Sequence, residues 1–195
     1  MEYPCLFIMS ICTLVHRYGL LLLKICKDLT ENNTNSTPEK LTKILVDFNI
    51  IEKKIRLLTK TFSTPLLIIL LIYFSKLFTT MSYCLRKELT PLLLFELCSN
   101  GSTSLLMMFF LTTCCSRIPD YMLRIKTKAK VLIDNQVLRG LEGSKNMYLL
   151  NRISKKDTIY LSAGGLLDFK KSFVFSTFGT VFAYGLLILN LSRIS

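Results

Sequence analysis

An uncharged apolar run near the C-terminus, from Ser172 to Ser192, is the feature that most constrains the fold. At 1.5 Å rise per residue, a helix of this length is roughly 30 Å long, which matches the hydrocarbon core of a bilayer. The run therefore predicts a transmembrane helix, preceded by Lys170 and Lys171. At about 100° per residue, its small and polar residues share one face: Ser172, Ser176, Gly179, Ala183 and Asn190. Such a row suits close packing against another helix, or the wall of a watery path, better than contact with lipid.

Three further apolar runs occupy residues 5–26, 65–85 and 103–115, and apolar residues make up 51% of the chain. This composition predicts an all-α, polytopic membrane helix bundle. The run 5–26 is interrupted by His16 and Arg17, and a signal peptide is its rival interpretation. Against that rival, the first residues carry no basic charge and no small-residue cleavage site follows. The run 103–115 is short for a span, because we expect Asn100–Gly101 to break the helix.

The polar segment 27–64 contains a second strong pattern. Thr37 and Pro38 read as the cap and first residue of a helix, which Pro65 should end. Within that helix, apolar residues recur at steps of three and four: Leu41, Ile44, Phe48, Ile51, Ile55, Leu58 and Phe62. This narrow apolar seam favours a helix packed in a cytoplasmic bundle, although a helix lying on the membrane surface has the same kind of pattern.

The basic residues indicate how the chain is oriented. Segments 27–64 and 116–171 hold most of the 25 Lys and Arg residues, whereas the loop 86–102 holds two. By the positive-inside rule, the first two segments are cytoplasmic and the loop is extracellular. Asn100 is then a candidate glycosylation site. In segment 116–171, Asp120 is the expected cap of a helix that packs with the seam. Cys84 and Cys98, at the two ends of the outer loop, either form a bridge or are ordinary thiols.

Several function classes find no support in the sequence. One histidine and scattered acidic residues give no metal site and no acid–base pair, so we expect no enzyme and no cofactor. The basic blocks lie between apolar runs and carry no recognisable nucleic-acid module, so we expect no nucleic-acid partner. We do expect the bilayer as a partner. Lys76 lies inside an expected span, where it should snorkel or line a cavity.

The stretch AGGLLDFKKSFVFSTFGTVFAYGLLILNL resembles the C-terminal end of the arthropod gustatory receptors. That family ends in Thr-Tyr, five apolar residues and Gln-Phe. This chain has Ala183, Tyr184, five residues, Asn190 and Leu191. Tyr184 matches, Asn190 is a shortened Gln, and Ala183 and Leu191 depart from the pattern.

The resemblance implies a seven-transmembrane receptor of which this chain would be the last four helices: residues 1–26, 65–85, 103–115 and 172–192. Segments 27–64 and 116–171 would form a cytoplasmic anchor. It further implies a homo- or hetero-tetramer in the plasma membrane of chemosensory neurons, opened by a small-molecule tastant and conducting cations. Each last helix would line the pore, with Asn190 as a pore-facing amide and Leu191 as a hydrophobic constriction.

Other expected sites are less closely defined. Candidate ligand-pocket residues share aromatic, soft or polar character inside the expected spans: His16, Tyr73, Phe74, Met81 and Tyr83. Gly164 and Gly165 are either a hinge before the last span or a tight turn. The alternative functions are a non-channel four-helix scaffold or accessory protein, and a non-functional receptor fragment.

Overall fold

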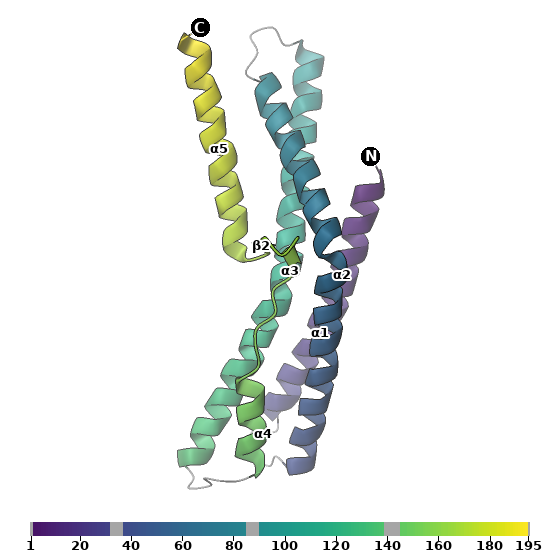
Figure 1. Cartoon of the computed structure of the whole chain (residues 1–195), viewed down its shortest axis with the longest axis vertical. Helices are drawn as coiled ribbons and strands as arrows, with labels where there is room; N and C mark the ends of the chain where they lie inside the picture. Colours follow the sequence, from purple (N-terminus) through teal and green to yellow (C-terminus); the bar gives the residue numbers. More distant parts are fainter. Residues whose placement is uncertain (1, 32–36, 85–89, 139–144, 195) are drawn as a thin grey trace. The chain divides into compact units, whose positions relative to one another are not determined.

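The computed structural model describes residues 2–31, 37–84, 90–138 and 145–194. Its elements follow one another along the chain (Figure 1): α1 (Glu2–Glu31), α2 (Pro38–Cys84), α3 (Pro91–Leu138), α4 (Lys145–Ser154), β1 (Ser162–Ala163), β2 (Leu167–Asp168) and α5 (Lys171–Ile194). The predicted class is confirmed, because the described chain is almost entirely helical.

Three of these helices are long and apolar enough to cross a membrane: Cys5–Glu31, Pro38–Tyr83 and Pro91–Leu138. A shorter apolar stretch, Phe175–Leu187, lies within α5. The lengths and apolar surfaces of these helices are those of a membrane protein.

The long helices run past the boundaries that the sequence predicted. Pro65 lies inside α2 and does not end that helix as predicted. Pro119 likewise lies inside α3. Neighbouring helices make such interior prolines tolerable in membrane proteins, because they re-satisfy the freed backbone groups. Asp120 is therefore in the interior of α3 and not at the start of a helix; the prediction that it is a helix cap is wrong.

The expected break at Asn100–Gly101 is also wrong, because α3 already begins at Pro91. A Cβ placed at Gly101 would lie 3.1 Å from Thr80 Cγ2 of α2. The glycine thus allows α2 and α3 to approach closely, which is a common use of small residues between membrane helices. Of the predicted loop 86–102, the part from residue 91 onward is helix.

The chain forms two compact units. Unit 1 comprises Met1–Met9, Phe62–Cys115 and Leu161–Ser195, and unit 2 comprises Ser10–Thr61 and Ser116–Tyr160. In unit 2, six of the seven predicted seam positions are buried: Leu41, Ile44, Phe48, Ile51, Ile55 and Leu58. The seventh, Phe62, is half-buried and belongs to unit 1. The predicted start is confirmed too, because the N–H groups of Lys40 and Leu41 donate to the Thr37 carbonyl at 3.1 and 3.3 Å.

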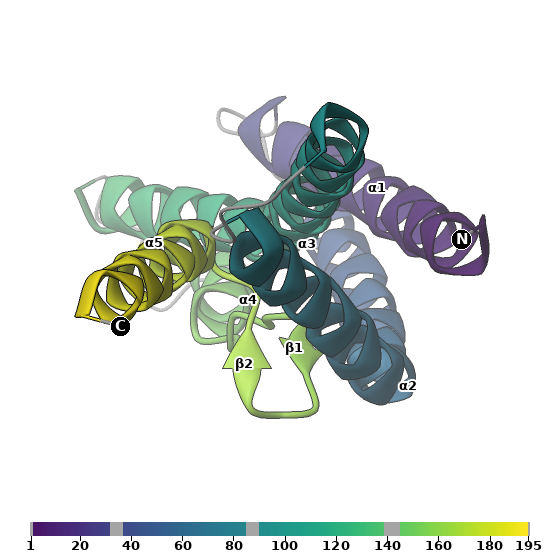
Figure 2. The ribbon, with the colours of Figure 1, turned by 90° about the horizontal axis from the view of Figure 1, so that it is seen from above.

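In unit 1, a two-stranded hairpin leads into α5 (Figure 2). Ser162 pairs with Asp168 and Ala163 with Leu167. The turn uses Gly164 (φ 62°) and Gly165 (φ 70°), a left-handed conformation that glycine adopts without a steric penalty.

This turn is docked on α2. The Gly164 N–H donates to the Ser63 carbonyl at 2.8 Å, and the Gly165 N–H donates to Ser63 Oγ at 3.1 Å. Of the two interpretations of these glycines, a hinge or a tight turn, the structure shows a tight turn. It is hydrogen-bonded to Ser63, two residues before Pro65 in α2.

Candidate functional site

Helix α5 presents two opposite faces. Thr177 and Gly185 are buried and Val181 is half-buried, so this face lies against the rest of unit 1. Its partner is α2: a Cβ at Gly185 would overlap Met81, and the Tyr184 ring meets the Phe78 ring edge-on with centroids 6.5 Å apart. The small glycine therefore lets the two helices approach at this point.

The small and polar row lies on the other side of α5. Every member is exposed: Ser172, Ser176, Gly179, Ala183 and Asn190. A Cβ at Gly179 would meet nothing within 4 Å. At about 100° per residue, this row is centred roughly 180° from the face formed by Thr177, Val181 and Gly185. The chain thus covers one face of α5 and leaves the small-residue face open. The side chain of Leu191 lies outside the described residues, so its predicted position in the pore stays a prediction.

A cavity of about 350 Å³ lies between α2 and α5. Phe74 and Met81, two of the predicted ligand-pocket residues, line it together with Tyr184 and Gly185. Its size falls at the lower end of the range for small-molecule sites, about 300–1,000 Å³. The sequence singled out Tyr184 for its place in the C-terminal signature, not as a wall of this cavity.

A second cavity, of about 570 Å³, lies between α2 and α3. Tyr83, predicted for the ligand pocket, lines it with Lys76 and Asn100. Asn100 is half-buried within α3 and not in a surface loop. Cys98 is a free, exposed thiol on the same helix, while the side chain of Cys84 lies outside the described residues.

The other two predicted pocket residues lie elsewhere. Tyr73 is 4% exposed, and its hydroxyl lies 3.9 Å from Cys5 Sγ, so this side chain joins α1 to α2 within unit 1. His16 belongs to unit 2, where it is exposed. The structure therefore groups Phe74 with Met81 and places Tyr83 in a neighbouring cavity. It does not form one pocket from all five residues.

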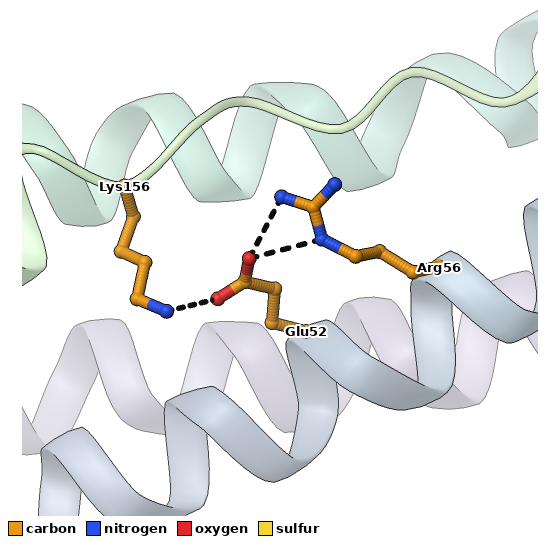
Figure 3. A network of polar contacts seen from close by, with 3 residues as sticks. All are labelled: Glu52, Arg56 and Lys156. Atoms are coloured by element: carbon orange, nitrogen blue, oxygen red, sulfur yellow. Dashed lines mark hydrogen bonds and ion pairs between the residues drawn. The ribbon is translucent and has the colours of Figure 1, made fainter.

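Unit 2 contains a charged cluster that the sequence did not predict (Figure 3). The side chain of Glu52 is 9% exposed. Arg56 Nε and Nη2 donate to Glu52 Oε1 at 3.1 and 2.9 Å, and Lys156 Nζ donates to Oε2 at 2.6 Å. Burial by itself raises the pKa of Glu52, but the hydrogen bonds and charges of Lys156 and Arg56 outweigh it, so that the pKa lies below 4.5.

This cluster ties α2 to the segment that follows α4, within unit 2. The partner Arg56 is visible in the sequence, four residues after Glu52 on the same helix. The partner Lys156 is 104 residues away, and no local pattern indicates it.

No protein-family model matches the chain, and no curated protein matches its sequence. Among the described residues, no group of His, Cys, Asp and Glu side chains is placed to hold a metal ion.

Proposed function

We propose that this protein is a subunit of a ligand-gated cation channel of the gustatory-receptor type, which detects small-molecule tastants at the plasma membrane of chemosensory neurons. In this proposal, homo- or hetero-tetramers surround one pore and each subunit gives α5 to its wall. Agonist opens the pore by binding more tightly to the open state than to the closed state.

The observation that carries the proposal is the division of α5 into two faces. Its covered face packs on α2 of the same chain, and its small-residue face is left open. Small side chains allow close helix approach, and hydroxyl and amide groups suit a water-filled path better than lipid. Sister copies around a common pore would cover this face and use its polar groups.

The other features of α5 are compatible with this arrangement. Phe175 and Phe182 are 79% and 67% exposed and lie to one side of the small-residue row, as side chains facing lipid would. The cavity beside Tyr184 adjoins the covered face of α5. A ligand bound there would contact the proposed pore helix directly, without entering the pore.

Asn190 provides the functional test. It is exposed on the open face, where an amide ring would replace part of the hydration shell of a permeating ion. We expect Asn190→Leu to abolish tastant-evoked current or change its ion selectivity, with surface expression unchanged. The assay is whole-cell recording with a panel of sugars, bitter compounds and organic acids. Phe175→Leu, at an exposed position to one side of the small-residue row, is the matched control and should leave the current unaltered.

Two results would argue against the proposal. One is an Asn190→Leu channel with the conductance and selectivity of the unsubstituted protein. The other is the absence of current from the unsubstituted protein across the panel, although it reaches the cell surface.

A further inference from the structure

Lys76 places a positive charge within the span part of α2. It precedes Cys84, the end of the helix, by eight residues, or roughly 12 Å of helix. Within the described residues it forms no ion pair with an acidic side chain; its Nζ lies 5.6 Å from the centroid of the Tyr73 ring. Ionisable residues at membrane depth are costly and are usually paired or functional. Among the described side chains, no acidic group therefore supplies the counter-charge that such a position calls for.

Lys76 lines the cavity between α2 and α3, which has two kinds of surface. Ile68, Leu71 and Ile72 of α2 and Leu97 of α3 give it apolar walls. Asn100 and Thr80 line the same cavity as Lys76 and add an amide and a hydroxyl to it. The cavity, about 570 Å³, is within the range for small ligands. A ligand that fits it carries a polar, negatively charged end and an apolar body.

We propose that this cavity binds a free monocarboxylic acid with an apolar chain, with the carboxylate on Lys76 and the chain along Ile68, Leu71 and Leu97. One ammonium matches one carboxylate charge, and Asn100 can donate to a carboxylate oxygen. The claim that such an acid is the ligand of the receptor rests on the proposed function. The claim that the cavity binds the acid does not.

The depth of the site favours a free acid over a bilayer phospholipid. A hydrocarbon core about 30 Å thick has its midplane about 15 Å from each face. Lys76 lies roughly 12 Å along the helix from its end. With residues 65–85 as the predicted span, this is below the level at which phospholipid headgroups are held. A single-chain acid can enter the cavity whole.

The binding test compares dodecanoate with its uncharged methyl ester. The full chain is placed in phosphatidylcholine nanodiscs at pH 8, and equilibrium binding of each radiolabelled probe is measured. Hydrogen bonds to charged groups lead us to expect at least about tenfold tighter binding of dodecanoate. Lys76→Met should remove this preference and Lys76→Arg should keep it. Lys60→Met, an exposed lysine on the same helix outside the cavity, should leave it unchanged.

Equal binding of the two probes to the unsubstituted chain, or a preference that persists in Lys76→Met, would overturn the proposal. Competition by phosphatidylglycerol added to the nanodiscs would assign the site to a bilayer lipid and overturn it as well. Because no current is measured, these outcomes are separate from those of the Asn190→Leu recordings. The chain can conduct ions without binding the acid at this site, and it can bind the acid there without conducting ions.

Discussion

Replacing Gly164 with alanine tests the docking of the hairpin turn on α2. Gly164 and Gly165 share a left-handed backbone, with φ of 62° and 70°. Their surroundings differ. A Cβ at Gly164 would lie 2.6 Å from Leu67 Cδ2, whereas a Cβ at Gly165 would meet nothing within 4 Å. The two substitutions therefore carry the same kind of backbone cost, and only the first adds a steric overlap.

The magnitudes follow from these two terms. A non-glycine residue in this conformation costs about 1–2 kcal/mol, which is the whole effect expected of Gly165→Ala. Overpacking costs about 1–3 kcal/mol, and we take the lower end because the overlapping atom ends a rotatable side chain. We therefore expect Gly164→Ala to lower the free energy of unfolding by about 2–3 kcal/mol.

The difference in stability between Gly164→Ala and Gly165→Ala is measured by thermal unfolding of the detergent-solubilised protein. Unfolding is detected by the reaction of the buried cysteines with a thiol-reactive dye. Leu67→Ala serves as the second half of a double-mutant cycle, because removing the overlapping atom should bring Gly164→Ala down to the cost of Gly165→Ala. If Gly165→Ala proves as destabilising as Gly164→Ala, or if Leu67→Ala leaves the gap between them intact, the docked turn is refuted.

Two further predictions concern unit 2. Because its partners lower the pKa of Glu52, the cluster stabilises the fold above pH 4.5 and loses that contribution as the pH falls through the lowered value. Glu52→Gln should therefore lower stability by about 1–2 kcal/mol at pH 7, allowing for the exposure of Arg56. The difference in melting temperature between Glu52→Gln and the unsubstituted protein should be smaller below the lowered pKa of Glu52 than at pH 7. A difference of equal size at pH 7 and in acid would contradict the account. Phe48→Ala, at a fully buried seam position, should cost about 3–5 kcal/mol, whereas Leu57→Ala, at a residue 65% exposed, should change stability by less than about 0.5 kcal/mol in the same assay.

Local patterns in the sequence predicted the helical architecture, the seam and the start of α2. These features depend on the spacing of apolar residues and on the Thr37–Pro38 cap, which neighbours in the chain supply. The two-faced character of α5 was also visible, because the positions of Ser176, Gly179 and Ala183 follow from helical geometry alone.

Other features depend on residues distant in the chain. Asn100–Gly101 resembles a helix break, yet Thr80 of α2 packs against Gly101 and the helix continues. Which face of α5 is covered depends on α2, and the partner Lys156 of Glu52 comes from beyond α4. Local propensity contains no information on any of these contacts, which is why the sequence alone missed them.

Disulfide cross-linking along α5 tests the central claim most directly. Ala183→Cys places a thiol on the open face, and Val181→Cys places one on the face that packs within the chain. Both variants are oxidised in native membranes. The unsubstituted chain, treated in the same way, gives the background of cross-linking by the native cysteines. The account predicts disulfide-linked subunit pairs from Ala183→Cys and none above background from Val181→Cys. Cross-linking from neither variant, or equally from both, would contradict a pore lined by the open face of α5.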